Sequence, residues 1–238
     1  MSEVTTENNP SQRGTGDLVL CGERLQALAE GALYWPKFEL LVVADLHFEK
    51  GSSFAVRGCF LPPYDTGATL ARLEGLMGRW KPARVIALGD SFHDGGAEAR
   101  IARVDAERIN HLVTASDWTW IAGNHDPLPP GFAGHVAEEV RLGPLTFRHE
   151  PAPAPATGEV CGHLHPCAVV RVRGRRLRRR CFATDTTRMV LPAFGAYTGG
   201  LNVCDKAFEP LFAGRQFHAW MMGEAQVVPV AGKRLLPD

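Results

Sequence analysis

The sequence lacks several features that would assign a protein to a class at sight. Its 26 lysines and arginines balance 26 aspartates and glutamates, so a preference for nucleic acid or membrane must come from a local patch. No apolar run reaches about 18 residues, so we expect no membrane-spanning helix. Residues 1–16 are polar and lack the apolar core of a secretory signal, which predicts a disordered tail and a cytoplasmic protein.

Several catalytic motifs are also missing. The six cysteines include no C-x-x-C pair, and we interpret them as reduced, mostly buried thiols. The chain has no G-x-S-x-G, G-x-x-x-x-G-K or G-x-G-x-x-G motif. These absences argue against a serine hydrolase of the nucleophile-elbow type, a P-loop NTPase and a dinucleotide-binding enzyme.

Short apolar runs alternate with helical patterns in the first half of the chain. Three runs are too short for most helices and suit strands buried on both faces: residues 39–44, 85–88 and 118–122. Apolar residues recur at helical spacing over 66–80, where Thr66 is a candidate cap, and over 97–112. This alternation predicts an α/β fold, in which ligands bind where the carboxyl ends of strands meet their loops.

The rest of the chain is rich in strand patterns. Residues 18–20 and 32–35 suit an opening pair of strands joined by a short polar turn or helix. After Gly143 we expect a strand at residues 145–149, a hairpin around Gly174, and strands of a second sheet at residues 188–194 and 225–230. Residues 159–161 repeat the pattern of the three buried runs in a shorter form. With 45% hydrophobic and 22% charged residues, the segment 17–238 is expected to form a single globular domain.

Five short blocks place ligand-type side chains at or near the ends of these runs. They are Asp45-x-His47, Gly89-Asp90, Gly123-Asn124-His125-Asp126, His149 and Gly162-His163-x-His165. Alternate residues of an extended segment share a face, so Asp45 and His47 offer a carboxylate oxygen and an imidazole nitrogen together. Asp90 has one oxygen for each of two cations. His163 and His165 can face two cations only if the backbone turns locally, which the glycine ahead of them permits.

The block 123–126 is the most specific of the five. Asn124 offers a neutral oxygen ligand, and His125 is free to stabilise charge on a phosphate or to protonate a leaving oxygen. Asp126 would hold His125 in one tautomer through a hydrogen bond. Taken singly, these residues also suit turns, caps or surface positions. Their order, and the apolar run ahead of four of the blocks, indicate a two-metal site for phosphoester cleavage.

The order of these blocks resembles that of the calcineurin-like metallophosphoesterase superfamily. The resemblance covers residues 45–165 and implies a four-layer α/β/β/α sandwich with the metals at one edge. The stretches D-L-H-F-E-K-G from Asp45, G-D-S-F-H-D from Gly89 and G-H-L-H-P from Gly162 are similar to those of DNA-ligase-associated metallophosphoesterases. These are bacterial proteins that are encoded beside a ligase, a helicase and a nuclease of a repair cluster.

The resemblance also implies a ligand set for two divalent ions. Asp45, His47 and His165 would bind the first ion, and Asn124, His149 and His163 the second, with Asp90 between them. His125 would be the catalytic histidine, supported by Asp126. Manganese is the expected metal because the ligands mix nitrogen and oxygen, with iron or zinc as alternatives. A hydroxide bridging ions roughly 3.5–4 Å apart would attack phosphorus in line, without a covalent intermediate.

The substrate is indicated by local charge. Seven arginines lie between positions 171 and 180, and such a patch suits a nucleic-acid backbone. The alternative is a solvated edge hairpin whose charges discourage aggregation. Arg176 near the expected tip, Arg57 and His93 are weaker candidates for substrate contact.

We therefore expect a metal-dependent phosphodiesterase or endonuclease that acts on DNA in repair. The alternatives are a phosphatase or small-nucleotide phosphodiesterase, and a non-catalytic scaffold of a repair complex. A scaffold is disfavoured because every ligand position is filled, and a small substrate because no segment between the motifs looks like a cap domain. The gene neighbourhood of the resembling proteins suggests the DNA ligase and helicase as partners.

Overall fold

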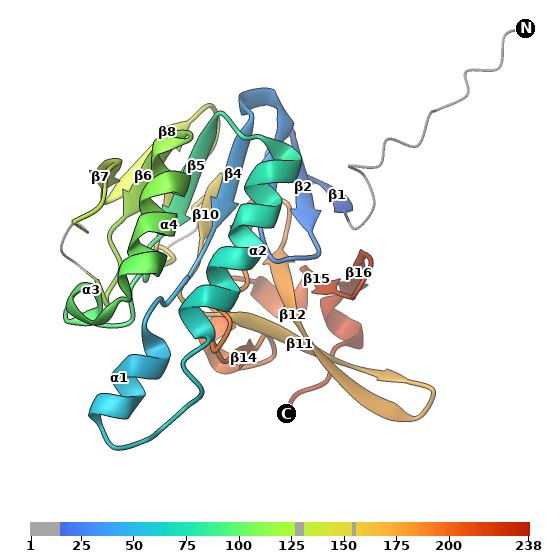
Figure 1. The fold of residues 1–238 in the computed structure, drawn as a ribbon. Helices are drawn as coiled ribbons and strands as arrows, with labels where there is room; N and C mark the ends of the chain where they lie inside the picture. The colour runs from blue at the N-terminus through green and yellow to red at the C-terminus, as the bar shows by residue number, and fades with distance from the viewer. Residues whose placement is uncertain (1–14, 127–130, 154–155) are drawn as a thin grey trace, which may run out of the picture.

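Two β-sheets pack face to face, with helices outside the first sheet (Figure 1). The computed structural model describes residues 15–126, 131–153 and 156–238. Residues 1–14 of the expected tail therefore lie outside the described residues. Thr15 and Gly16, which were expected in that tail, instead begin the first strand.

The first sheet follows the order of the chain. Its strands are β1 (Thr15–Leu20), β2 (Glu23–Leu28), β3 (Leu33–Trp35), β4 (Leu40–Val43), β5 (Arg84–Leu88), β6 (Asp117–Ile121) and β7 (His135–Ala137). Strands β1 to β4 pair antiparallel, and β4 to β7 pair parallel. The three apolar runs form β4, β5 and β6, as expected. In β4, Leu41 and Val43 face the helices while Leu40 and Val42 face the second sheet, so the strand is buried on both sides.

The link expected between the first two strands is itself a strand, β2. Its Leu25 and Ala27 are buried between the sheets, while Arg24 and Gln26 alternate with them. The polar composition of this segment suggested a turn or helix, but alternation with a period of two decides the structure.

Two longer helices cover the first sheet: α2 (Asp65–Trp80) and α4 (Arg103–Thr114). Two shorter ones are α1 (Lys50–Val56) and α3 (Ala97–Arg100). Helix α2 matches the expectation, but Thr66 does not cap it. The Thr66 hydroxyl instead accepts a hydrogen bond from the Glu49 amide and donates one to the Glu49 carboxylate. The second expected helix is interrupted at Ile101 and Ala102, whose backbones are extended, and so becomes α3 and α4.

The second sheet runs in the order β14-β11-β12-β13-β10-β9-β8, with β15 and β16 added beside β12. Its strands are β8 (Glu139–Leu142), β9 (Leu145–Arg148), β10 (Glu159–Cys161), β11 (Pro166–Val172), β12 (Arg175–Thr184), β13 (Arg188–Val190), β14 (Leu201–Asn202), β15 (His218–Met222) and β16 (Val227–Ala231). The hairpin of β11 and β12 turns at Arg173 and Gly174, which both have positive φ, as a tight two-residue turn requires. Figure 1 shows this hairpin projecting beyond the body of the domain.

Three buried clusters define the layers. One lies between the first sheet and helices α2 and α4, and a second lies between the two sheets. The third covers the outer face of the second sheet, where Phe208, Phe212 and Phe217 come from irregular chain and 3-10 turns such as η3 (Lys206–Phe208). The expected α/β/β/α order of layers is observed, with short 3-10 turns in place of long helices in the fourth layer.

Two expectations drawn from absences can be compared with the described residues. None of their helices is long and apolar enough to cross a bilayer. All six cysteines are unpaired, but only Cys161, Cys167 and Cys181 are buried, and Cys59 is exposed.

Candidate metal centre

The five motif blocks converge at one edge of the sandwich. Asp45, Asp90 and Asn124 follow the carboxyl ends of the adjacent parallel strands β4, β5 and β6. His149 follows β9, and His163 with His165 follows β10, in the second sheet. Because the two sheets pack face to face, these loops meet at the same end. The α/β topology thus explains why residues far apart in sequence lie together.

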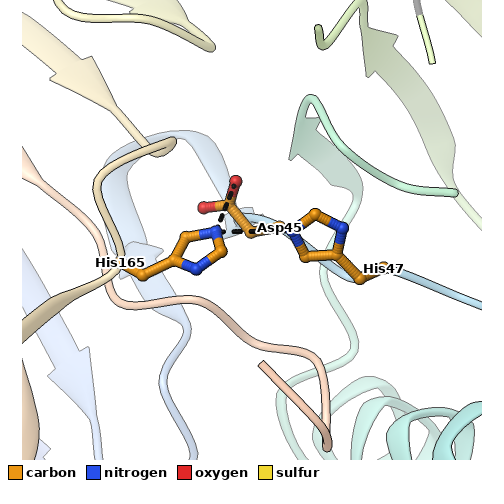
Figure 2. A group of neighbouring side chains, drawn as sticks. All are labelled: Asp45, His47 and His165. Carbon is orange, nitrogen blue, oxygen red and sulfur yellow. Dashed lines mark hydrogen bonds and ion pairs between the residues drawn. The ribbon is translucent and has the colours of Figure 1, made fainter. Parts of the chain in front are cut away.

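The first group of side chains consists of Asp45, His47 and His165, whose ligand atoms lie within 4.8 Å of one another. Figure 2 shows His165 pointing toward both other residues. Its Nε2 lies 3.3 Å from Asp45 Oδ1 and 3.4 Å from His47 Nε2. Asp45 is fully buried and His47 nearly so, which holds both ligands in fixed positions.

The second group consists of Asp90, His149 and His163. Asn124 belongs to it as well, because its Oδ1 lies 2.9 Å from His149 Nε2 and 3.0 Å from His163 Nδ1. His149 Nδ1 donates to the Leu88 carbonyl at 2.9 Å, which leaves Nε2 facing the group. The hydrogen bond to Leu88 fixes the ring and its tautomer in the way that is usual for metal-binding histidines.

Asp90 stands between the two groups. Its Oδ2 lies 3.8 Å from His47 Nε2 in the first group, and its Oδ1 lies 3.4 Å from His149 Nε2 in the second. The Asp90 carboxylate therefore offers one oxygen to each group. This is the arrangement that a bridging ligand requires.

The electrostatics of the centre favour positive charge. Burial opposes ionisation of Asp90, but the hydrogen bond and charge of His149 outweigh it and hold the pKa of Asp90 well below its usual range. Burial also opposes charge on His149, yet Asp90 and Asp45 raise its pKa to about 9. For His47 burial dominates and lowers the pKa to about 2. A divalent cation bound here would take the place of the positive charge that the two buried carboxylates draw onto His149.

The donor set itself supports metal binding. Several imidazole nitrogens face one another, such as His149 Nε2 and His163 Nδ1 at 3.3 Å. Carboxylate and amide oxygens approach the same points as these nitrogens. Clusters of this kind are more typical of metal ligands than of a hydrogen-bonded core. Mixed nitrogen and oxygen donors suit manganese, iron or zinc. The side chains present thus fit two divalent ions.

The backbone is strained where the ligands are. Five ligand-type residues have positive φ, with values between 45° and 67°: Asp45, His47, Asp90, His163 and His165. Each costs on the order of 1–3 kcal/mol and persists only where the surrounding fold enforces it. A Cβ on Gly123 would lie 2.2 Å from the Asp90 amide nitrogen, and one on Gly162 would lie 2.7 Å from Asp45 Oδ2. Glycine at these positions lets the loops approach one another.

His125 lies at the open side of the centre. It is exposed, and its ring centroid is 5.2 Å from that of His47. Its backbone amide donates to Asp90 Oδ1 at 2.9 Å, and its Nδ1 donates to the His93 carbonyl at 2.9 Å. The second nitrogen of His125 is thereby left for a substrate.

Asp126 does not make the hydrogen bond to His125 that the sequence suggested. Its Oδ2 accepts from the backbone amides of Ser91 and Phe92, at 2.8 and 3.0 Å. Burial raises the pKa of Asp126 to about 6. The residue ties the loop that carries Asp90 to the loop that carries His125, and the His93 carbonyl orients the His125 ring instead.

The three weaker candidates for substrate contact lie in different surroundings. His93 is buried beside the centre, with its Nδ1 3.4 Å from His47 Nδ1 and its ring stacked on His125. Arg57 is exposed at the end of α1. Arg176 lies on the projecting hairpin, away from this cluster, and donates to the Pro237 carbonyl.

One supporting segment was not identified from the sequence. The amides of Phe194 and Gly195 donate to the carbonyls of Ala44 and Asp45, at 2.7 and 3.0 Å. The segment thus supports the loop that carries the first ligand. Its glycines were the one available indication, because a Cβ on Gly195 would lie 2.3 Å from the Leu46 carbonyl oxygen.

Comparison with known proteins identifies the class. The Calcineurin-like phosphoesterase family matches residues 38–179, more than half of the chain, and the chain belongs to this family. It is a metal-dependent phosphoesterase, as the motif order predicted.

Among solved structures, the chain is similar to the Pseudomonas putida nuclease MPE. The two share 29% identity with a TM-score of 0.69, over 90% of this chain and all of that one. This similarity agrees with the resemblance to ligase-associated metallophosphoesterases. The phosphoesterase YfcE from E. coli aligns at 16% identity and a TM-score of 0.37, over 81% of this chain and 98% of that one. No match was found among curated protein sequences.

Proposed function

We propose that the protein is a two-metal phosphodiesterase that cleaves DNA during repair. The position of Asp90 is the observation that carries the proposal, because its two oxygens face two separate groups of ligands. The similarity to a nuclease supports nucleic acid as the substrate. Manganese is the proposed metal, and a cytoplasmic location and association with a ligase and a helicase belong to the same proposal.

Two divalent cations, when bound there, would hold a phosphoryl oxygen and lower the pKa of a bound water enough for attack at neutral pH. The protein contributes the rest. Buried Asp45 and Asp90 supply carboxylate oxygens as ligands, and His125 is positioned to meet the charge that develops on the substrate. The His93 carbonyl fixes the His125 ring so that one nitrogen is free to act on the leaving oxygen.

The surroundings of the centre suit a polymeric substrate. Among the described residues between β4 and β10, the chain forms strands and helices of the sandwich itself and no separate cap domain. The hairpin β11–β12 starts directly after His165 and carries exposed Arg171, Arg173, Arg175 and Arg179. At about 3.3 Å per residue, the seven residues of β11 extend roughly 20 Å from the centre, which suits contact with a long backbone.

Not all seven arginines of the patch are available. Arg178 pairs with Asp238, and Arg176 donates to Pro237. Arg180 is half-buried and donates to the carbonyls of Ala193 and Thr198, at 3.0 Å each. The proposed backbone contacts are therefore confined to the exposed arginines at the tip and on the opposite face of β12.

The first experiment compares bis-p-nitrophenyl phosphate with p-nitrophenyl phosphate, with manganese and with a chelator. We expect hydrolysis of the diester that requires manganese and is abolished by the chelator. A preference for the monoester would replace the proposal by the phosphatase alternative. No turnover of either compound by protein that holds its full complement of metal would favour a scaffold.

A second experiment tests the hairpin. Replacing Arg173 and Arg175 together with alanine is expected to weaken DNA binding and to reduce the slope of log K against log salt by up to about 2. Hydrolysis of bis-p-nitrophenyl phosphate should not change, because that substrate is too small to reach the hairpin. Arg103→Ala on α4, which removes a 92% exposed side chain, is the matched control. An unchanged salt slope in the double variant would show that the hairpin does not contact DNA.

A further inference from the structure

Two aromatic side chains extend into solvent from the segment 57–64, which joins α1 to α2. Phe60 is 84% exposed and Tyr64 is 70% exposed. In the described part of the chain, all other phenylalanine, tyrosine and tryptophan residues are partly or fully buried. Within that part, neither ring packs against another ring. Large apolar side chains are normally buried, so two together on one short segment suggest a ligand.

The segment begins beside the metal centre. Helix α1 starts three residues after His47, and its Phe54 stacks on the ring of His93 at 6.1 Å. His93 in turn contacts His47 and His125. The Phe54 carbonyl accepts from the Arg57 and Cys59 amides, at 3.0 and 2.9 Å, so the start of the segment is fixed to this helix.

The end of the segment returns to the same place. Tyr64 precedes Asp65, whose Oδ2 accepts from the Gly51 amide at 2.8 Å, and Thr66, which is bonded to Glu49. Glu49 and Gly51 follow His47 by two and four residues. Both ends of the segment are therefore held within a few residues of a metal-ligand candidate.

The middle of the segment is anchored by a hydrogen bond from Tyr197. The Tyr197 hydroxyl donates to the Pro62 carbonyl at 2.8 Å, and Gly195, two residues earlier, donates to the Asp45 carbonyl. Pro62 and Pro63 each fix a backbone φ angle. The two rings are thus presented on a preorganised segment, which lowers the entropy lost on binding.

Two cations lie at the ends of helix α1, which leads from the centre to the segment that carries the rings: Lys50 is its first residue, and exposed Arg57 follows its last. A strand whose phosphodiester occupies the metal centre would pass these cations before reaching the rings. Phosphate and base are the two parts of a nucleotide that such neighbours would bind.

We propose that Phe60 and Tyr64 form a stacking platform for unpaired bases of the strand that the metal centre cleaves. The proposal rests on the proposed nucleic-acid substrate. Exposed aromatic rings bind bases by their faces and tolerate any sequence. Bases inside a duplex have no free face, so the platform selects a single strand or an unpaired region near the scissile bond.

The test is an abasic scan of a single-stranded oligodeoxynucleotide, cleaved by the wild type and by Phe60→Ala. In the wild type, removing one particular base near the cut site should lower kcat/KM about fivefold or more. Phe60→Ala should lower kcat/KM on the intact strand by a similar factor and should be insensitive to that abasic position. Phe60→Trp should retain activity. Val104→Ala, which truncates another exposed apolar side chain on α4, is the matched control.

Hydrolysis of bis-p-nitrophenyl phosphate separates the possible failures. Phe60→Ala should leave it unchanged, because this substrate has no base. If the wild type hydrolyses the diester but cleaves no oligonucleotide, the proposed nucleic-acid function fails. If it cleaves oligonucleotides and the double Phe60→Ala, Tyr64→Ala variant does so equally well, the platform is overturned and the rings fit a protein partner instead. Equal loss of both activities would also overturn it, since the segment would then support the centre itself.

Discussion

Replacing Asp90 with asparagine is expected to lower kcat/KM for bis-p-nitrophenyl phosphate by about a thousandfold or more. Asp90 turns one oxygen toward each ligand group, so the change weakens both metal sites at once. A thousandfold decrease in kcat/KM corresponds to a loss of about 4 kcal/mol of transition-state stabilisation. Metal content per chain, measured after dialysis, should fall together with activity.

The fold should survive the Asp90 change. Asparagine keeps an oxygen that can accept the His125 amide, which Asp90 Oδ1 accepts at 2.9 Å. Thermal unfolding monitored by circular dichroism therefore serves as the control for structure. Asp117→Asn is the matched carboxylate control, because Asp117 is exposed at the opposite, amino end of strand β6. Activity and metal content near those of the wild type in Asp90→Asn would refute the bridging arrangement.

The parts of the fold that could be predicted share one property, a local pattern with a single physical meaning. The runs that became β4, β5 and β6 are buried on both faces, and only a central parallel strand explains such runs next to polar loop residues. Helix α2 was equally clear because its apolar stripe is uninterrupted. The motif order gave the family, which the comparison confirmed.

Other features depend on contacts that no local pattern contains. Helix α1 and the anchoring of Thr66 depend on Glu49, whose backbone and side chain both bond to that hydroxyl. The expected partner of His125 was its neighbour Asp126, but this carboxylate accepts two backbone amides from the loop of Asp90 instead. The sequence shows how many arginines the hairpin carries, but only the folded structure shows which groups Arg178 and Arg180 contact.

Replacing His125 with alanine is expected to lower kcat by about 100- to 10,000-fold while the metal content stays at the wild-type level. His125 lies at the edge of the centre and is exposed, and it belongs to neither of the two ligand groups. Its Nδ1 is already bonded to the His93 carbonyl, so its remaining nitrogen is the atom available to a substrate. The variant should therefore lose catalytic activity while it retains its metal ions.

The leaving group distinguishes the two roles that His125 can have. Protonation matters for the alkoxide leaving group of DNA but hardly for p-nitrophenolate, which leaves without a proton. If His125 is a proton donor, His125→Ala should impair DNA cleavage much more than hydrolysis of bis-p-nitrophenyl phosphate. If it only stabilises charge on the phosphate, both activities should fall by the same factor. His135→Ala, which removes an imidazole that is 80% exposed on β7, is the control, and wild-type activity in His125→Ala would exclude both roles.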